Sequence, residues 1–464
     1  MDRGQTVTEP NRSALLADWI SDLTIEDIPN AARIAVENTV IDTAALTIAA
    51  LETDYGRAVR KAFDAEGSST IWGLNQQVDA TAAAIINGTC GHGEDYDNTF
   101  EGCPVHTGVV MVPALFAAGE AMQLSNADIA KGLLVGIETA HRLGLVAGKG
   151  VHAAGFHPTA ILGTMGAAAG VAAAMGQSRQ QIIDTLGVAG SMAAGIIEYL
   201  ADGSWTKRLH AGWAAQSGIR AAQMGASGFK GPKAVFEGTH GLFKAFAPSI
   251  TPDFSYLTDD LGVTFQAAKV AFKPYACGTM TQPFIDCAVR LGTKGVQPDD
   301  IARITCECGE GTVHRLWEPL AQKQKPPTAY AAKFSSPYTI AVGLLHGDAG
   351  LAAFTEEAVS DPKTLALAAK VSYVIDPNNE YPKNYTGHIR AELKNGDIVE
   401  ERQAQLRGGA KEPLSRTEII TKASANLAFS GRRPAAAGVL EDFALALFSE
   451  DASFDARPLS TLSA

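Results

Sequence analysis

A long run without charged residues, from Val151 to Ser178, constrains the fold more than any other stretch of the chain. It contains no Asp, Glu, Lys or Arg and consists mainly of Ala and Gly, with His152, His157 and Pro158 near its start. The run is long enough for a membrane span. Ala and Gly, however, supply far less transfer free energy than Leu or Ile. We therefore expect a helix buried inside a helical domain.

The rest of the N-terminal half has the same helical character. Apolar segments of helical length follow one another, and their joints carry Gly, Ser, Asn or Pro. Two helices are predicted within residues 11–51, and further helices at 55–65, 79–87, 109–123, 126–147, 159–175, 180–194 and 211–226.

The pattern changes near Phe272. Residues 302–308 alternate between apolar and polar side chains, which predicts a half-buried strand. Asn395-Gly396 separates the segments 388–394 and 397–403, which predicts a β-hairpin. A further strand is predicted at 370–375, and helices are predicted at 282–291, 329–346, 415–428 and 439–449.

These patterns predict a mainly α protein, with a large all-helical domain and a smaller α+β domain that contains an antiparallel sheet. The helical domain is expected to take residues 1–271 and 406–464, and the α+β domain residues 272–405. The helical domain is thus discontinuous, because the C-terminal helices return to it. The last dozen residues are expected to fray.

Charge and cysteine usage narrow the possible partners. The chain has 50 acidic and 38 basic residues, a net charge of −12 and no dense basic stripe. We therefore expect neither a nucleic-acid nor a membrane partner. The six cysteines show no C-x-x-C pair, which favours reduced thiols in a cytoplasmic protein. The first residues lack an apolar core, so no secretory signal is expected.

Ionisable residues concentrate between two apolar helices in the segment Gly91–Thr107, which contains His92, Asp95, Asp97 and His106. Burying such groups is costly unless they have partners. A calcium loop is rejected, because the turn glycine is missing and a histidine occupies the twelfth position. A metal site built from these two histidines and two aspartates has no diagnostic spacing. The alternatives are a catalytic or substrate-binding loop and simple helix capping.

Four other motifs place polar residues at the starts of apolar segments. His157 precedes the charge-free helix, where a base of near-neutral pKa would face the positive end of a helix dipole. Lys207 and Arg208 precede the predicted helix 211–226, where cations oppose the macrodipole and suggest a bound anion. The remaining motifs are Lys273-Pro-Tyr275 and Lys333-Phe-Ser-Ser-Pro-Tyr338. An N-cap residue or an ordinary surface lysine is the structural alternative for each.

Several familiar motifs are absent from the sequence. No Gly-rich fingerprint follows a predicted strand, and there is no P-loop or G-x-S-x-G elbow. The cysteines do not match an iron–sulfur ligand set. Dinucleotide, nucleotide and iron–sulfur chemistry therefore have no support.

In their order and spacing, the five motifs resemble the MmgE/PrpD family over roughly residues 12–450. The resemblance rests on His92…Asp95-Tyr-Asp97…Thr99, Val105-His106, Gly155-Phe-His157-Pro158, the segment 206–218, Lys273-Pro-Tyr275 and Lys333-Phe-Ser335…Pro337-Tyr338. It implies a large helical domain, a smaller α+β domain, a homodimer and a site between the domains.

The resemblance also implies a set of site residues: Asp95, Thr99, His106, His157, Lys207, Lys273 and Tyr338, to which Arg208 is added as a second cation beside Lys207. The chemistry of such a site is proton abstraction from a carbon next to a carboxylate, which needs cations at the carboxylate and a base at the carbon. The expected substrate-binding residues are Lys207, Lys273, Thr99 and Arg208. The expected catalytic residues are His106, His157 and Tyr338, with Asp95 orienting a histidine.

Two positions depart from the family pattern. Asn98 stands where a second acid is frequent, and Gln282 stands where many members have a histidine, which weakens a dehydratase interpretation. In length and overall pattern the chain resembles family members that epimerise iminodisuccinate, a small amino-dicarboxylate. The resemblance therefore implies this epimerisation, without metal or organic cofactor. The alternatives are a dehydratase or decarboxylase of a citrate-like acid (2-methylcitrate or cis-aconitate), and a non-catalytic binding protein of the same fold.

Overall fold

The computed structural model describes residues 11–449 and 452–462. Residues 1–10, where no secretory signal is expected, and the last two residues lie outside this part. The chain divides into two compact units. Unit 1 comprises Met1–Gly93, Asn98–Val270 and Ala435–Ala464, and unit 2 comprises Glu94–Asp97 and Ala271–Pro434. The segment Glu94–Asp97 thus belongs to unit 2, although the chain on both sides of it belongs to unit 1.

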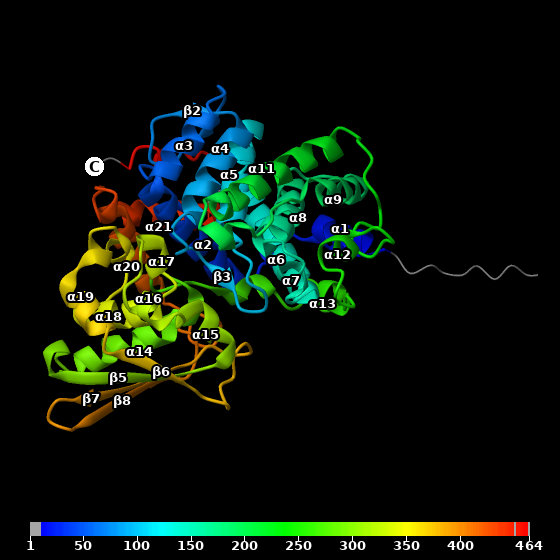
Figure 1. Ribbon diagram of the computed structural model, residues 1–464. Coiled ribbons are helices and arrows are strands. Elements are labelled where there is room, and N and C mark those ends of the chain that lie inside the picture. The colour runs from blue at the N-terminus through cyan, green and yellow to red at the C-terminus, as the bar shows by residue number, and fades with distance from the viewer. Residues whose placement is uncertain (1–10, 450–451, 463–464) are drawn as a thin grey trace, which may run out of the picture. The chain divides into compact units, whose positions relative to one another are not determined.

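Unit 1 is built mainly from helices (Figure 1). Its longer helices are α1 (Arg12–Asp22), α2 (Asn30–Ala50), α3 (Asp54–Ala62), α4 (Ala80–His92), α5 (Gly108–Met122), α6 (Asn126–Ala147), α8 (Pro158–Ala174), α9 (Arg179–Met192), α11 (Thr206–Ala226) and α21 (Ala436–Ser449). Short helices and strands join them: β1 (Ser69–Thr70), β2 (Gln77–Val78), β3 (Thr99–Phe100), α7 (Gly150–Ala153), α10 (Tyr199–Asp202), α12 (Leu242–Phe246) and α13 (Ser255–Thr258). Strand β4 (Val270–Ala271) ends the unit's long middle segment.

The charge-free run forms α8, and every residue of this helix is buried. Helices α6 and α11 both pack against it. The prediction of a buried helix is therefore confirmed. No single described helix is long and apolar enough to cross a membrane; α2 and α3, bent by 93° at their joint, meet that test only as a pair.

Unit 2 contains a four-stranded sheet in the order β6-β5-β7-β8. The strands are β5 (Ile301–Cys308), β6 (Val371–Ile375), β7 (Gly387–Leu393) and β8 (Ile398–Gln403). The pairs β5–β7 and β7–β8 are antiparallel, and the Asn395-Gly396 hairpin is confirmed. Strand β6 pairs with β5 in parallel, with Cys306 opposite Tyr373. The sheet is therefore mixed and not wholly antiparallel as expected, because a helical connection between β5 and β6 lets both strands run the same way.

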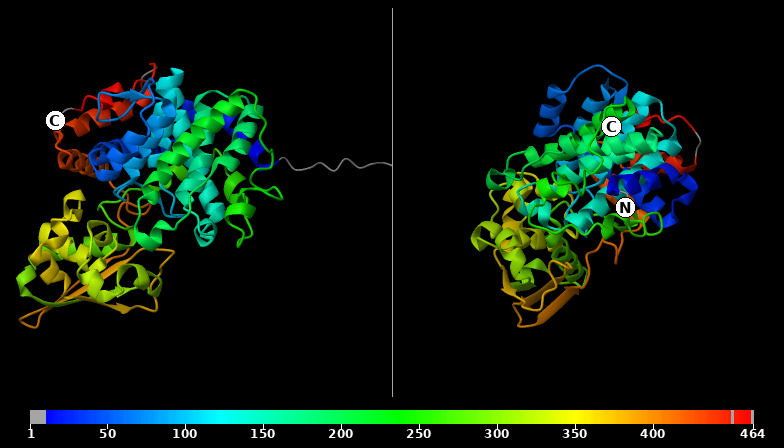
Figure 2. Two further views of the ribbon diagram at one scale, coloured as in Figure 1. Left: turned by 45° about the horizontal axis from the view of Figure 1, so that its top comes forward. Right: turned by 90° about the vertical axis from the view of Figure 1, so that its right-hand side faces the viewer.

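Helices cover one face of this sheet, with α14 (Gln282–Thr293) directly on β7 and β8 and α18 (Ser336–His346) packed on α14 (Figures 1 and 2). Phe284 and Trp317 lie in the core between these layers, with Ile304 and Cys306 from β5. The other helices of the unit are α15 (Glu310–Leu316), α16 (Leu320–Gln324), α17 (Ala329–Ala332), α19 (Pro362–Ala368) and α20 (Arg416–Phe429).

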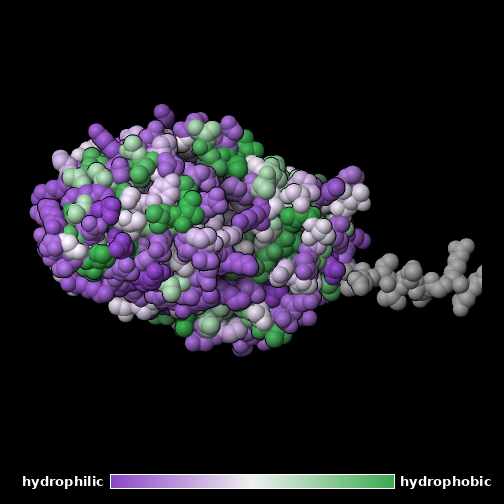
Figure 3. Space-filling view, turned by 60° about the horizontal axis from the view of Figure 1, so that its bottom comes forward, coloured by the Kyte–Doolittle hydropathy of each residue, from purple (hydrophilic) through white to green (hydrophobic). Residues whose placement is uncertain are grey.

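The opposite face of the sheet carries cross-strand pairs of ionisable side chains. His388 Nδ1 lies 2.7 Å from Glu307, and the Arg390 guanidinium lies 3.4 Å from Glu400. Such pairs suit a solvated sheet face. Figure 3, which turns the bottom of Figure 1 toward the reader, shows mainly hydrophilic residues over unit 2. This face therefore explains the alternating pattern that predicted the strands.

Three expectations differ from the structure: one domain boundary, the extent of one helix and the fraying of the C-terminal residues. Residues 406–434, expected in the helical domain, belong to unit 2, where Arg407 forms an ion pair with Asp286 at 2.8 Å. The helix expected at 329–346 is two helices, because the Ser335 side chain accepts the Tyr338 amide hydrogen and starts α18 anew. The expected fraying does not hold for the described residues up to 462, among which Phe454 and Leu459 are buried.

All six cysteines are free and buried. Burial raises the pKa of the thiols of Cys90 and Cys103 in unit 1, and of Cys277 and Cys287 in unit 2, to about 12. Cys306 is shifted further in the same direction for the same reason, since its pKa lies well above the ordinary value. These thiols are therefore protonated and unreactive while the fold is intact.

Candidate functional site

Four buried histidines of unit 1 pack into one group, which we call the histidine cluster: His92, His106, His157 and His210. The His92 and His157 rings stack with their centroids 5.6 Å apart. The His106 ring lies 4.9 Å from that of His92 and 6.4 Å from that of His157. His210 lies 5.3 Å from His157, and Tyr199 packs against both.

Helix ends bring these side chains together. His92 is the last residue of α4, and His157 is the N-cap of α8, where Pro158 can take the first helical position because its missing N–H is not needed there. His210 lies near the start of α11. Helices α4 and α11 approach closely at two glycines: a Cβ added to Gly88 would lie 2.7 Å from the Gly212 Cα. The absence of side chains at these two positions thus brings His92 and His210 into one cluster.

Burial lowers the pKa of two members of the cluster, His157 and His210. It is the largest cause that lowers the pKa of His157 well below its ordinary value, and the positive charges of His92, Lys207, His210 and His106 lower it further. The pKa of His210 falls to about 4, first because of burial and then because of His92 and Lys207. These two imidazoles are therefore neutral near pH 7, as a general base must be.

Hydrogen bonds fix the tautomer of His106 and couple the tautomers of His157 and His210 to each other. His106 Nδ1 lies 2.9 Å from the Asn98 carbonyl oxygen, which can only accept, so Nδ1 carries the hydrogen. The Nε2 of a neutral His106 then carries a lone pair. The Asn98 side chain accepts the Gly108 amide hydrogen at 3.0 Å, which anchors Asn98. His157 and His210 face each other through Nδ1 atoms 3.2 Å apart, so one ring donates and the other accepts.

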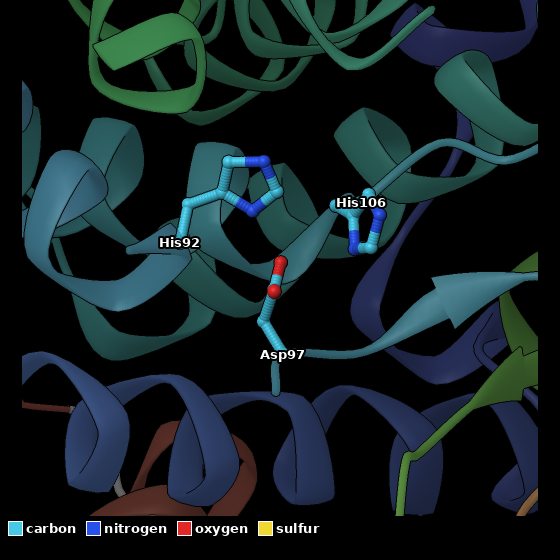
Figure 4. Close-up of side chains that lie close together, drawn as sticks. All are labelled: His92, Asp97 and His106. Carbon is cyan, nitrogen blue, oxygen red and sulfur yellow. The ribbon is translucent and has the colours of Figure 1, made fainter. Parts of the chain in front are cut away.

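One part of the segment 92–106 has the composition of a metal site. His92, Asp97 and His106 are buried, and one ligand atom from each lies within 4.8 Å of the other two. Figure 4 shows the Asp97 carboxylate directed toward the space between the two rings. Two imidazoles and a carboxylate are ligands that Zn²⁺ accepts. Asp95, the fourth ligand considered from the sequence, is engaged elsewhere, and the expectation of metal-free chemistry stays a prediction.

Asp95 and Lys273 form a buried ion pair within unit 2. The Lys273 Nζ lies 2.8 Å from the Asp95 Oδ1 and donates to the Asp95 carbonyl oxygen at 2.6 Å. Asp95 adopts a left-handed backbone with φ 54°. Its carboxylate was expected to orient a histidine, and Lys273 was expected to bind substrate. The structure pairs the two with each other, and the roles expected for them stay predictions.

The other predicted site residues occupy separate surroundings. Tyr338 is buried and its hydroxyl donates to the Ala353 carbonyl oxygen at 2.7 Å, and burial raises its pKa. Thr99 is buried in β3. The Arg208 guanidinium lies over the Tyr55 ring at 4.3 Å, so an aromatic face stabilises this cation. Unit 1 therefore gathers His106, His157 and Lys207, and unit 2 gathers Asp95 and Lys273.

Two members of the histidine cluster were not predicted as site residues. His92 was assigned to loop structure, because α4 was expected to end at Asn87, whereas it runs to His92 itself. His210 was seen only as a neighbour of the cations, because α11 was expected to begin at Ala211. It begins at Thr206, which places Lys207 and His210 three residues apart on one helical face.

Comparison with known proteins agrees with this architecture. Residues 14–255 match the MmgE/PrpD N-terminal domain, and residues 275–440 match the MmgE/PrpD C-terminal domain. Together these matches cover most of the chain. The chain belongs to the MmgE/PrpD family.

Curated relatives of the chain are named as decarboxylases. The cis-aconitate decarboxylase-like protein oryM of Aspergillus oryzae is 27% identical over 442 residues, which cover 89% of this chain and 90% of that protein. The cis-aconitate decarboxylase of Homo sapiens is 29% identical over 385 residues, covering 79% and 76%. That of Mus musculus is 28% identical over 376 residues, also covering 79% and 76%.

Proposed function

We propose that the chain is an enzyme that transfers a proton to or from carbon in a small di- or tricarboxylic acid, and that the reaction is a decarboxylation of the cis-aconitate type, in which the proton is added to carbon after CO₂ is lost. The observation that carries the proposal is the histidine cluster. Buried imidazoles, of which His157 and His210 are neutral at neutral pH, lie together with Lys207 near them. A neutral imidazole can donate a proton from one nitrogen and accept one at the other, and a nearby cation can bind a carboxylate, so the cluster suits proton transfer to or from a carbon beside a carboxylate.

His106 and His157 are the proposed proton-transfer groups. The lone pair on His106 Nε2 can take a proton, and a histidine that has been protonated can return it. In a decarboxylation, the C–C bond to the leaving carboxylate breaks and its electron pair moves onto the allylic carbon framework. This cleavage releases CO₂. An imidazole N–H group then gives one proton to the carbon framework and regains a proton from water, so the step balances. Lys207 is proposed to hold a remaining carboxylate and to stabilise the negative charge that develops beside it.

Three considerations rank the reactions. The relatives reported above are named as cis-aconitate decarboxylases, which supports the lyase over the epimerase expected from the sequence. Gln282 stands where a dehydratase of this family would need a histidine, which argues against dehydration. The Gln282 side-chain oxygen accepts from the Tyr275 N–H at 3.1 Å, and its NH₂ group donates to the Tyr275 and Cys277 carbonyl oxygens at 3.0 Å. Gln282 therefore stabilises a turn, and its amide cannot act as an acid or a base. Epimerisation of iminodisuccinate, which the Gln282 substitution leaves possible, is the second candidate.

The direct test is incubation of the purified protein in deuterated water with cis-aconitate, the iminodisuccinate isomers and 2-methylcitrate in parallel. We expect CO₂ release from cis-aconitate with one deuterium on the product carbon. Deuterium at the α-carbon of iminodisuccinate with interconversion of its isomers, and no CO₂, would establish epimerisation instead. Failure to turn over any of these acids would favour a non-catalytic binding protein.

Replacing His157 tests its role directly. We expect His157→Ala to lower kcat by about a hundredfold or more, the lower range for a general acid–base group. His240→Ala is the matched control, because this histidine lies outside the histidine cluster, in the segment before α12. Turnover by His157→Ala within a few-fold of the unaltered protein, with His240→Ala also active, would remove His157 from the mechanism.

Replacing Lys207 separates binding from chemistry. We expect Lys207→Met to raise KM for every carboxylate tested and to lower kcat/KM by about tenfold to a hundredfold, because a charge-assisted contact contributes about 1.5–3 kcal/mol. Lys233→Met, an exposed lysine of unit 1, is the control. An unchanged KM would show that Lys207 does not hold a substrate carboxylate.

We also propose a cytoplasmic homodimer. Six free, buried thiols fit a reducing compartment. Light scattering is expected to give twice the chain mass of 48.5 kDa, and a value equal to that of one chain would contradict the dimer.

A further inference from the structure

Three buried lysines bind three consecutive carbonyl groups of the segment Glu94–Asp97. Lys333 Nζ donates to the Glu94 carbonyl oxygen at 2.8 Å, Lys273 Nζ to that of Asp95 at 2.6 Å, and Lys422 Nζ to that of Tyr96 at 2.7 Å. All of these groups belong to unit 2. We call Lys273, Lys333 and Lys422 the lysine clamp.

The side chains of the segment strengthen each of these contacts. The Glu94 carboxylate lies 3.1 Å from the Lys333 Nζ, and the Asp95 carboxylate lies 2.8 Å from the Lys273 Nζ. At Lys422 a ring replaces the carboxylate: its Nζ lies 3.9 Å from the centroid of Tyr96. The Tyr96 hydroxyl in turn donates to the Pro274 carbonyl oxygen at 2.8 Å.

Burial makes these contacts strong. The exposed fractions of Lys273, Lys333 and Lys422 are 4%, 2% and 6%. A buried ammonium is costly unless it is paired and hydrogen-bonded, and each here has at least one carbonyl. The clamp also holds Asp95 in a left-handed backbone conformation, which a non-glycine residue adopts only when its surroundings impose it.

The clamped segment is continuous with the histidine cluster on both sides. One residue, Gly93, separates it from His92, and it ends next to Asn98, whose carbonyl accepts from His106 Nδ1. The carbonyl group that sets the tautomer of His106 therefore belongs to the residue directly after the clamped segment. Lys273 and Lys333 belong to the sequence motifs, whereas Lys422 lies on α20 outside all of them.

We propose that Lys422 is a positioning residue for the reaction: by holding the Tyr96 carbonyl, it completes the lysine clamp that sets Asn98 and thereby the tautomer of His106. This inference rests on the proposed function only for its kinetic consequence. The positioning itself is a property of the fold. Removing the ammonium would leave the Tyr96 carbonyl buried without this donor, at a cost that loosens the segment.

The test compares Lys422→Met, which keeps an unbranched stem of similar length, with the milder Lys422→Gln and with Lys411→Met, an exposed lysine of the same unit. Hydrogen exchange across residues 94–99 and the ¹⁵N shifts of the His106 ring are measured first, without substrate. We expect at least tenfold faster exchange of this segment in Lys422→Met, a smaller increase in Lys422→Gln, mixed His106 tautomers and no change in Lys411→Met. If Lys422→Met does not fold, the same comparison is made with Lys422→Gln alone.

Kinetics follow on the substrate that is turned over. We expect kcat to fall about tenfold or more in Lys422→Met with little change in KM, and no further loss when the variant is combined with His106→Asn, because Lys422 acts through His106. Unchanged exchange and an unchanged His106 tautomer would overturn the proposal whatever the substrate. If Lys422→Met exchanges faster across residues 94–99 but the unaltered protein turns over no carboxylate, the positioning role of Lys422 is supported and the proposed function is refuted.

Discussion

His157 and His210 meet through their Nδ1 atoms, and this contact ties the state of one ring to the other. A neutral imidazole has one donor and one acceptor nitrogen. The ring that donates its Nδ1 hydrogen has an unprotonated Nε2 with a lone pair. The other ring, which accepts at Nδ1, carries its hydrogen on Nε2. The pair thus offers one basic and one acidic nitrogen without any charged group, in surroundings that disfavour the imidazolium.

We predict that His210→Phe changes the ring state of His157. A phenyl ring fills similar space but offers no nitrogen, so a buried Nδ1 would lose its partner at a cost of about 1–3 kcal/mol. We expect a change in the ¹⁵N shifts of His157 and a fall in kcat of about tenfold or more, with partial recovery in His210→Asn. Identical His157 shifts in His210→Phe would show that His210 only fills space.

The sequence marked most of the residues for which a chemical role is proposed, but not their partners. The concentration of ionisable groups between apolar helices marked His106, because burying such groups without partners is costly. The position of His157 at the start of the charge-free helix marked the second histidine. Nothing in the spacing of Asp95 and Lys273, 178 positions apart, indicates that they pair. Nothing in the sequence around Lys422 indicates its role, because Lys422 binds a backbone carbonyl group, and every residue has one.

At the scale of elements, the contact between α4 and α11 determines whether the histidine cluster forms. A Cβ at Gly212 would overlap the Ile85 carbonyl oxygen. Backbone on the other helix cannot move aside as a flexible side chain can. The two helices would have to separate, and they carry His92 and His210 respectively.

We therefore predict that Gly212→Ala lowers the free energy of unfolding by about 1–3 kcal/mol, as overpacking does, and lowers kcat as well. Gly438→Ala on α21 is the control: the space around it is open, and its backbone is ordinary. We expect that control to be neutral or stabilised by up to about 1 kcal/mol. Chemical denaturation of both variants measures the difference, and equal stabilities would contradict the role given to this contact.

Helices were predicted better than their ends and their pairing. Apolar periodicity located α5, α6, α8 and α9 closely, since it depends on residues within a few turns. The early start of α11 was missed because Lys207 and Arg208 oppose the helix dipole there. The ring of Tyr55, which lies under the Arg208 guanidinium, stabilises one of these two cations. The parallel pairing of β6 with β5 depends on residues far apart in the chain, which local alternation does not report.

For the molecule as a whole, buried neutral histidines predict how stability depends on pH. The pKa of His141 and that of His210 are both lowered to about 4, chiefly by burial. The pKa of His157 lies well below its ordinary value for the same principal reason. In the unfolded chain these rings bind protons below about pH 6.5. Between about pH 6.5 and 4 the unfolded state therefore binds more protons than the folded state, and stability falls as the pH falls.

We predict that these histidines leave the free energy of unfolding nearly constant above about pH 7. Below that pH, each of them is expected to lower it toward pH 4 with a slope of about 1 kcal/mol per pH unit. His141→Gln is expected to reduce that slope, because glutamine does not titrate. Urea denaturation at several pH values measures it. A slope that is the same in His141→Gln would show that His141 does not contribute.

The burial of all six thiols has a practical consequence for following how this chain opens. Two thiols, Cys90 and Cys103, belong to unit 1, and the other four belong to unit 2. A membrane-permeant or soluble alkylating reagent can reach neither set until the surrounding unit unfolds. The number of adducts on each chain, read by mass spectrometry, therefore reports which unit has opened: two for the first, four for the second, six for both. The native sequence thus carries its own pair of reporters, and no engineered label is needed.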